Sequence, residues 1–456
     1  MKRAQEIRNP YSGAKLGEYR YASNEEIAQV MLRLARGRER QRALAPFERA
    51  EILLKLVALL RDDANEFATL ISEETGKVLR DSRLEVSRAL NTLQCSAEEA
   101  RRLSGELLNS DAFPPKRGRR GLVEWRPIGT VLAITPFNFP LNLVVHKIGP
   151  AFAAGNSIFF KPSPQAWLCA RRFTELAHEA GIAEEILQLC LPDIPELQRV
   201  LQHPLITCVN LTGSVRAGKA IAVAAGPKKL LLELGGNDPL IVLPDADLEA
   251  AAATAVAQRF VSAGQRCTAA KQLFVHQHCA RRFSELLLDQ TQALVIGDPL
   301  DEKTDVGPVI HEKAAEQVMG AIAGTLAAGA QLLAGNRREG AVVWPTVLDQ
   351  VPEQSPVVRE EIFGPVAPLR PFRDLAEVIR QVNAQPFGLQ AGVFTNDLAA
   401  VKRLFDELEV GALAVNDGPG FRAEHFPFGG VKDSGLGREG ISYAMREMSV
   451  QKTLVI

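Results

Sequence analysis

Residues 130–161 read TVLAITPFNFPLNLVVHKIGPAFAAGNSIFFK. Two short apolar runs, 130–134 and 157–161, flank a segment near 141–154 whose length and apolar content predict a helix. A strand, a helix and a second strand in this order predict two parallel strands with the helix packed against them. The same alternation continues downstream, with strands near 205–211 and 229–233. The stretch therefore predicts an α/β fold with a parallel sheet, and ligands in such sheets bind at the carboxyl ends of the strands.

Helical periodicity dominates the chain before this stretch. Apolar residues recur at spacings of three and four in segments 24–36, 47–74 and 81–103, each predicted to be one helix. A short extended lead-in with a turn at 9–13 precedes them, and a Pro/Gly/basic break follows at 111–120.

A second alternating α/β region follows Gly235-Gly236 and runs to about residue 428. The last residues, 448–456, are rich in strand-forming types. An unpaired apolar strand is an aggregation hazard, so we expect this tail to pair with another chain.

Composition excludes several functional classes. The 53 basic and 54 acidic residues nearly balance and form no long block of one sign, so neither nucleic acid nor an acidic membrane is an expected partner. The chain lacks both a run of about 18 apolar residues and the apolar core of a signal peptide. Its six cysteines include no C-x-x-C pair, and no H-E-x-x-H occurs, so no metal site is predicted. We expect a cytoplasmic protein.

One cysteine occupies a position suited to chemistry. Residues 262–270 read SAGQRCTAA, with Cys267 between a helical segment at 248–260 and a β-prone run at 273–275. A thiol at such a junction can lie in a loop beside a backbone N–H, which suits a nucleophile. Most intracellular cysteines, however, are inert small hydrophobes in the core. The sequence around Cys267 alone leaves both readings open.

Four short segments together resemble the aldehyde dehydrogenase superfamily. They are TPFNFP (135–140), LELGGN (232–237), GQRCT (264–268) and EEIFGP (360–365), in this order along the chain. The resemblance implies a Rossmann-type cofactor domain, an α/β catalytic domain and a β oligomerisation arm. It places the NAD(P)-binding domain at 1–108 and 127–235, the catalytic domain at 236–433, and the arm at 109–126 and 443–456.

The resemblance also implies three catalytic roles. Cys267 matches the family's nucleophile, whose thiolate adds to an aldehyde carbonyl. The amide of Asn138 and the backbone N–H of Cys267 match the donors that meet the resulting oxyanion, and one such donor is typically worth about a hundred- to a thousandfold in rate. Hydride transfer to nicotinamide leaves a thioester. Glu233 matches the general base that activates water to release the acid.

The same resemblance implies a set of NAD or NADP contacts. Pro164 stands where the family often has a glutamate that joins the ribose-binding lysine. Without that carboxylate, the repulsion that excludes a 2′-phosphate is also missing, so NADP can be the cofactor, and NAD stays open. Ser163 and Ser214 also read as helix N-caps, a role compatible with a cofactor contact. The residues predicted to bind the cofactor are Thr135, Pro136, Lys161, Ser163, Gly213, Ser214, Glu361 and Phe363.

Segments 137–150 and 416–443 resemble family members that act on lactaldehyde, glyceraldehyde, and phosphono- or sulfo-acetaldehyde. We therefore hypothesise a short aldehyde that is hydroxylated or carries an anionic tail held by charge-assisted hydrogen bonds from Arg266, Arg422 and His425. Ordinary salt bridges of these arginines are the alternative. The residues matching the family's substrate funnel are Leu143, His146, Arg266, Thr268, Phe421, Arg422 and His425.

Two alternatives to a hydrolytic dehydrogenase stay open. A CoA-acylating relative would pass the acyl group to CoA instead of water, although it would not need Glu233. A non-catalytic homologue would keep the fold alone, although the matched Cys267, Asn138 and Glu233 argue against it. The strand near 122–126 and the tail resemble the family's oligomerisation arm, which implies a homodimer or a homotetramer.

Overall fold

The computed structural model describes residues 4–114 and 117–456. The first three residues of the predicted segment 1–108, and residues 115 and 116 of the predicted arm, lie outside the described residues. The helices are α1 (Asn24–Ala43), α2 (Pro46–Asp62), α3 (Ala64–Thr75), α4 (Leu79–Ala100), α5 (Asn142–Ala153), α6 (Trp167–Ala180), α7 (Ile194–Gln202), α8 (Val215–Ala225), α9 (Leu248–Phe260), α10 (Ala280–Gln292), α11 (Glu312–Ala327), α12 (Pro356–Arg359), α13 (Leu375–Asn383), α14 (Leu398–Glu407) and α15 (Ile441–Glu447).

Residues 130–161 form the centre of a six-stranded sheet, in the order β19-β9-β8-β5-β6-β7. Its strands are β5 (Thr130–Ile134), β6 (Ser157–Lys161), β7 (Leu187–Leu189), β8 (Ile206–Thr212), β9 (Lys229–Glu233) and β19 (Gly435–Leu436). The predicted strands at 130–134, 157–161 and 229–233 are confirmed, and all neighbours are parallel except β19. The chain leaves β5 for β6 and β7 on one side and returns to β8 and β9 on the other. The crevice for ligands is therefore expected between β5 and β8, at their carboxyl ends.

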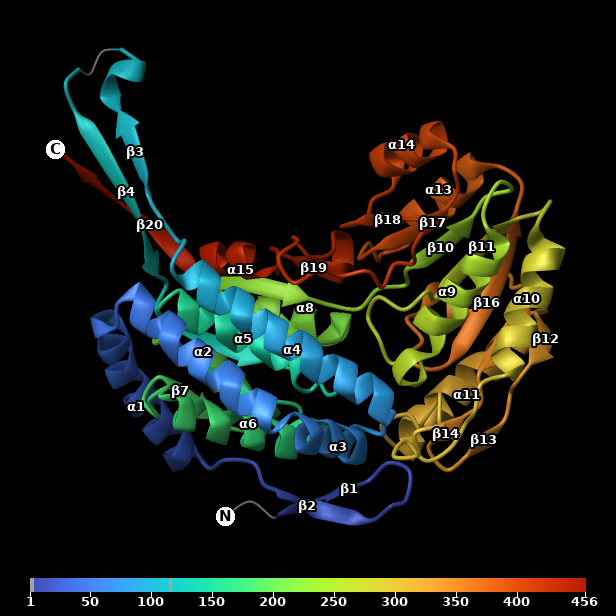
Figure 1. Cartoon of the computed structure of the whole chain (residues 1–456), viewed down its shortest axis with the longest axis horizontal. Helices are drawn as coiled ribbons and strands as arrows, with labels where there is room; N and C mark the ends of the chain where they lie inside the picture. Colours follow the sequence, from blue (N-terminus) through green and yellow to red (C-terminus); the bar gives the residue numbers. More distant parts are fainter. Residues whose placement is uncertain (1–3, 115–116) are drawn as a thin grey trace.

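A second sheet has seven strands in the order β12-β15-β16-β11-β10-β17-β18. They are β10 (Pro239–Val242), β11 (Gln272–His276), β12 (Gln331–Ala334), β15 (Thr346–Asp349), β16 (Val366–Phe372), β17 (Ala391–Phe394) and β18 (Leu413–Val415), all parallel to their neighbours except β12. Figure 1 shows this sheet beside the first, with α9, α10 and α11 around it. The motifs LELGGN, GQRCT and EEIFGP lead directly into β10, β11 and β16, respectively, and these three strands are adjacent in the sheet.

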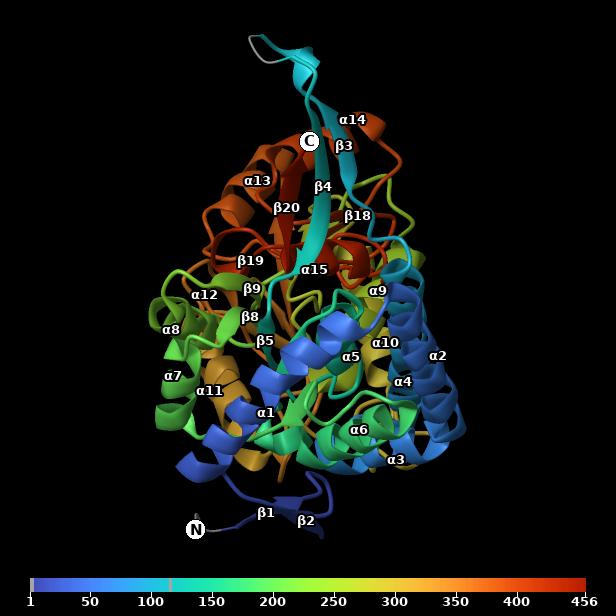
Figure 2. The ribbon, with the colours of Figure 1, turned by 90° about the vertical axis from the view of Figure 1, so that its left-hand side faces the viewer.

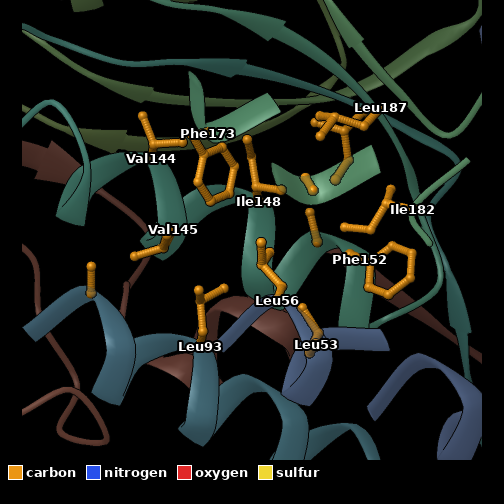
Figure 3. Packing of buried hydrophobic residues seen from close by; sticks show 14 of the residues in the cluster. Leu53, Leu56, Leu93, Val144, Val145, Ile148, Phe152, Phe173, Ile182 and Leu187 are labelled. Atoms are coloured by element: carbon orange, nitrogen blue, oxygen red, sulfur yellow. The ribbon is translucent and has the colours of Figure 1, made fainter. Parts of the chain in front are cut away.

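Helix α5 is buried along its whole length. Figure 3 shows why: its apolar side chains Val145, Ile148 and Phe152 meet Leu53 and Leu56 of α2 and Leu93 of α4. Its buried polar side chains have partners as well: Lys147 donates to Asn210 and Glu439, each at 2.8 Å. This packing fixes the loop between β5 and α5, which carries Asn138.

A three-stranded sheet in the order β20-β4-β3 projects from the molecule (Figures 1 and 2). Its strands are β3 (Glu106–Asn109), β4 (Arg120–Pro127) and β20 (Ser449–Val455). The tail was predicted to pair with another chain, and here it pairs antiparallel with β4 of its own chain, from Ser449 opposite Pro127 to Val455 opposite Gly121. Since β20 is an edge strand, its second edge remains for a further partner.

Two predictions about helices need correction. Segment 47–74 was predicted as one helix, but it forms α2 and α3, which meet at Asp63. Arg172 of α6 donates two hydrogen bonds to the Asp63 carboxylate, at 2.9 and 2.7 Å. The apolar spacing continues through both helices, so periodicity alone did not reveal the break. The first helix also extends beyond the predicted residue 36 to Ala43.

Two short hairpins complete the strands: β1 (Gln5–Arg8) with β2 (Lys15–Tyr19), which confirms the predicted lead-in turn, and β13 (Arg338–Glu339) with β14 (Val342–Val343). Short 3₁₀ helices lie at Ser110–Ala112, Pro164–Ala166, Val261–Gly264 and Lys432–Ser434. Across residues 4–114 and 117–456, every helix is too short or too polar to span a membrane.

Candidate active site

Cys267 lies in the loop between α9 and β11, as predicted. The chain turns sharply just before it, because Ser262, Ala263 and Gly264 have φ values of 51°, 52° and 75°. A Cβ atom at position 264 would lie 2.4 Å from the carbonyl oxygen of Gly364. Glycine is therefore required there both by backbone conformation and by space. The contact also packs the GQRCT motif against the EEIFGP motif.

The fully buried Arg259 of α9 holds these two motifs together. Its guanidinium donates to the carbonyl oxygens of Gly364 and Val366, and to that of Ile362 at 3.3 Å. Burial lowers the pKa of Arg259 to about 9. Sequence reasoning missed this residue. The available signal was a charged residue on the apolar face of α9, four residues after the buried Ala255.

Asn138 follows β5, and its side-chain nitrogen donates to the carbonyl oxygen of Gln265 at 2.9 Å. Gln265 is itself held, because its side-chain oxygen accepts from the N–H of Ile310 at 2.9 Å. An amide nitrogen has two N–H donors. The contact with Gln265 uses one of them and orients the group, which leaves the second for a ligand.

Glu233 ends β9 at the carboxyl edge of the first sheet, and neither of its carboxylate oxygens has a hydrogen-bond partner among the described residues. Burial, followed by the nearby Glu439 carboxylate, raises the pKa of Glu233 to about 7, while Arg422, Cys267 and Lys147 oppose the rise. A buried carboxylate without partners costs free energy, so its presence at the end of a strand indicates a functional role. With a pKa near neutrality, Glu233 can take up and release a proton at physiological pH.

Burial and the neighbouring Glu233 carboxylate raise the pKa of the Cys267 thiol well above its usual range. Two cations, Lys271 and Arg266, act in the opposite direction. The described structure therefore holds Cys267 as a thiol beside a carboxylate that can accept its proton.

A cavity of about 320 Å³ brings together most of the residues predicted for catalysis and for the cofactor. Cys267, Glu233 and Asn138 all line it. So do five of the eight residues predicted for the cofactor, namely Pro136, Gly213, Ser214, Glu361 and Phe363. The cavity lies where β5 and β8 end, at the switch in strand order.

Glu361 has room at this cavity because Gly235 has no side chain. A Cβ atom at Gly235 would lie 1.9 Å from Oε2 of Glu361. The N–H of Gly236 donates to Oε1 of Glu361 at 3.3 Å. Gly235 of LELGGN thus leaves room for the Glu361 carboxylate of EEIFGP, and Gly236 donates a hydrogen bond to it.

The other predicted cofactor residues lie around the cavity. Thr135 follows β5, and its buried hydroxyl has no partner among the described residues, like that of Thr212, which ends β8. Lys161 ends β6, where burial lowers its pKa to about 8. Ser163 caps the short helix that leads into α6, as predicted, accepting from the N–H of Gln165.

Ser214 caps α8, and its hydroxyl accepts from the N–H of Ala217 at 3.2 Å. The positive end of α8 therefore begins at the cavity, beside Gly213. Together with the partnerless hydroxyls of Thr135 and Thr212, this arrangement fits the phosphates and hydroxyls of a dinucleotide.

Two of the residues predicted for the substrate, His146 and Arg422, belong to a charged cluster outside the lining of this cavity. His146 bonds Glu424 at 2.7 Å and Arg422 at 3.2 Å. Arg422 also pairs with Glu439 at 2.9 Å, the salt-bridge alternative left open by the sequence. Glu424 accepts from Nε of Arg88 at 2.9 Å. Burial, then the charge of Arg422, lowers the pKa of His146 to about 4, so this ring is neutral at pH 7.

Arg266 and Thr268 flank Cys267 along the chain. Nε of Arg266 donates to the Thr268 hydroxyl at 2.9 Å, and its guanidinium also donates to the carbonyl oxygen of Gly420. His425 is exposed and packs edge-to-face against Phe426, away from these contacts.

Arg88 was missed by the sequence analysis. It lies on α4 three residues after the buried Glu85 and four before the buried Thr92. Polar residues at this spacing on a buried helical face were the available signal.

Comparison with known proteins places the chain in a family. Residues 1–454 match the aldehyde dehydrogenase family. A sulfoacetaldehyde dehydrogenase of Neptuniibacter caesariensis is 52% identical over 448 residues, covering 98% of each chain. A 3-sulfolactaldehyde dehydrogenase of Priestia aryabhattai is 40% identical over 453 residues, covering 99% of this chain and 94% of that one. The crystal structure of an NADP-dependent glyceraldehyde-3-phosphate dehydrogenase from Bacillus halodurans, complexed with NADP, has a TM-score of 0.97 at 36% identity, covering 100% and 96%.

The chain belongs to the aldehyde dehydrogenase family. It is an NAD(P)-dependent enzyme of this α/β fold, which confirms the fold class, the enzyme class and the cofactor class predicted from the sequence.

Proposed function

We propose that the chain oxidises a short aldehyde with an anionic tail, of the sulfoacetaldehyde or sulfolactaldehyde type, to its carboxylate. The similarity to the two sulfonate dehydrogenases supports this substrate class. The observation that carries it is a group of three arginines: Arg266, which directly precedes Cys267, and Arg88 and Arg422, whose charges act on Arg266.

These arginines have unused capacity to bind an anion. Nη2 of Arg88 and Nε of Arg422 are buried without hydrogen-bond partners among the described residues. Burial, then repulsion from Arg88 and Arg422, lowers the pKa of Arg266 to about 10. A sulfonate would supply acceptors to the free N–H groups and relieve the repulsion.

The proposed chemistry uses Cys267, Asn138 and Glu233 in the roles that the family resemblance implied. Glu233 takes the proton of the Cys267 thiol as the sulfur adds to the aldehyde carbon, and the amide of Asn138 donates to the oxygen that gains the charge. Glu233 then releases this proton to solvent and is again a carboxylate. A bound nicotinamide supplies the hydride acceptor, and oxidation leaves a thioester on Cys267. Glu233 then takes a proton from water as the water attacks the thioester carbon. The products are the carboxylate and the free thiol.

Turnover of a substrate panel tests the class. The purified protein, with NAD or NADP, should reduce the cofactor with sulfoacetaldehyde and 3-sulfolactaldehyde, and Cys267→Ser should abolish the reaction. Acceleration by CoA with formation of an acyl-CoA would instead identify the acylating alternative. Cofactor binding without turnover of any aldehyde would identify a non-catalytic homologue.

Arginine variants test the anion site. Arg266→Met and Arg88→Met should lower kcat/KM for sulfoacetaldehyde about tenfold to a hundredfold, because each removes charge-assisted hydrogen bonds. The value for uncharged propionaldehyde should change little. Arg282→Met is the control, since Arg282 is an exposed surface residue paired with Glu249. Equal losses for both aldehydes, or no loss, would contradict the anion site. Arg422→Ala is a less specific test of the anion site, because it also removes a salt-bridge partner of Glu439.

The division of labour between segments is part of the proposal. Residues 1–108 and 127–235 would hold NAD or NADP, 236–433 would carry the nucleophile, and 109–126 with 443–456 would join subunits of a cytoplasmic homodimer or homotetramer. The cavity supports the first two assignments, because residues of both α/β segments line it. The projecting sheet supports the third.

A further inference from the structure

Lys271 immediately precedes β11 and is buried. Its ammonium donates to the carbonyl oxygen of Gly236 at 2.8 Å, to that of Cys267, and to Oε1 of Glu361 at 2.8 Å. An ammonium has three N–H donors, so these three acceptors match it in number. One side chain thus ties together the segments that enter the adjacent strands β10, β11 and β16.

Lys271 connects Cys267 to Glu361, and both have central roles in the proposed site. Cys267 is the proposed nucleophile, and Glu361 is the carboxylate proposed for the nicotinamide ribose. Lys271 and the N–H of Gly236 both bind Oε1 of Glu361, while Oε2 lies against Gly235. The contact with Lys271 therefore fixes which oxygen of Glu361 is left for a ribose hydroxyl.

We propose that Lys271 is a positioning residue that couples the Cys267 loop to Glu361, so that the sulfur and the bound cofactor are held in one arrangement. This inference rests on the proposed roles of Cys267 and Glu361. Lysine suits this positioning role because its three N–H donors extend from one nitrogen atom in different directions. The N–H donors of an arginine lie in one plane and would need acceptors in that plane.

The charge of Lys271 adds a second consequence. The charged groups near Cys267 are Glu233, Lys271 and Arg266, and those near Lys271 are Glu361 and the buried Asp238. Lys271 opposes the effect of Glu233 on the Cys267 thiol, so its removal raises the pKa of that thiol further.

Two measurements that need no turnover test the coupling. In Lys271→Met, alkylation of Cys267 by iodoacetamide, followed on the Cys267 peptide across pH, should slow about tenfold at a fixed pH and shift its midpoint upward, since one pKa unit is a tenfold change in thiolate. The Kd for NADP should rise about tenfold as Glu361 loses its anchor. Lys402→Met, on the exposed face of α14, is the control and should match the wild type.

A double-mutant cycle separates coupling from a general structural effect. Glu361→Gln should change the alkylation rate of Cys267 in the wild type but not in Lys271→Met, because the two residues then act through one contact. Additive effects, or an alkylation profile unchanged in Lys271→Met, would overturn the proposal. If Lys271→Met does not fold, Lys271→Gln, which keeps two N–H donors without the charge, should show the same slowed alkylation, and a normal profile there would overturn it. Because the wild-type thiol and cofactor affinity are measured directly, an inactive wild type would count against the proposed function alone.

Discussion

Glu233 combines burial, partnerless oxygens and a pKa raised to about 7, chiefly by burial and then by Glu439. A protonated carboxyl cannot take a proton from water, so hydrolysis of the thioester should be slow below neutrality. We predict that kcat rises as the pH increases through about 7 and then levels off. Glu233→Gln should give one burst of reduced cofactor and then stall. A steady rate in this variant would remove Glu233 from its assigned role.

The same residue predicts a change in stability. The folded pKa of Glu233 lies above the value of 4.5 for the unfolded chain, so the folded state binds more protons between these two values. The stabilisation that comes from binding this proton more tightly in the folded state is therefore fully present below pH 4.5. It is lost as the pH rises through about 7. Glu233→Gln should unfold at a higher urea concentration than the wild type at pH 8, and this advantage should shrink towards pH 5. Equal midpoints at both pH values would mean that the burial of the charge is compensated elsewhere.

Individual residues also show which parts of the site can be predicted from the sequence. Cys267, Asn138 and Glu233 were predicted because each stands in a short motif, and the structure brings all three to one cavity. Lys271, Arg259 and Arg88 were missed because their contacts join segments far apart in the chain. Helical spacing could indicate that Arg259 and Arg88 are buried, but it does not identify their acceptors, which for Arg259 and Lys271 are mostly backbone carbonyls.

At the scale of elements, helix α4 holds the loop that carries Asn138. Oε1 of Glu85 accepts from the N–H groups of Leu141 and Asn142 at 2.9 and 3.0 Å, where α5 begins. Its other oxygen pairs with the buried Lys77, whose ammonium lies 3.7 Å from the centre of the Phe139 ring. A carboxylate at the start of α5 also meets the positive end of that helix.

We predict that Glu85→Ala lowers the free energy of unfolding by about 3–5 kcal/mol, because it leaves Lys77 as an uncompensated buried charge. Urea unfolding measures the loss. Glu98→Ala, on the same helix but exposed, should cost far less, since its pair with Arg102 is at the surface. Similar losses in the two variants would show that the Glu85 contacts add nothing specific.

Helix and strand positions were predicted well where apolar periodicity decides them, as in β5, β6 and β9. The break between α2 and α3 was not, since Asp63 is set by Arg172, 109 residues away in the chain. Periodicity reports which side of a helix is buried but not where a tertiary contact ends it.

At the scale of the whole molecule, the two sheets explain where the site lies. The first sheet presents the carboxyl ends of β5, β8 and β9 to the cavity, and the second presents the segments that enter β10, β11 and β16. The order of the motifs along the chain does not indicate that three of them enter neighbouring strands. Strand order follows from pairing across the chain, which local patterns do not encode.

The projecting sheet makes a prediction about assembly. Leu454, Val455 and Ile456 at its end are exposed in the single chain, and β20 has one unpaired edge. Contiguous exposed apolar residues beside an open strand edge mark an interface. We therefore expect a dimer or a dimer of dimers in solution, as measured by size-exclusion chromatography with light scattering.

Deleting residues 449–456 should give monomers or insoluble protein, because it also removes the partner of β4. Leu454→Lys with Val455→Lys is the gentler change, since both backbones can still pair while two charges enter the apolar end of the arm. This variant should shift the mass toward monomer with the fold retained. Leu398→Lys, at an even more exposed apolar position on α14, is the control and should keep the wild-type mass. An unchanged oligomer in the arm variant would place the subunit contact elsewhere, and a monomeric wild type would contradict the assembly itself.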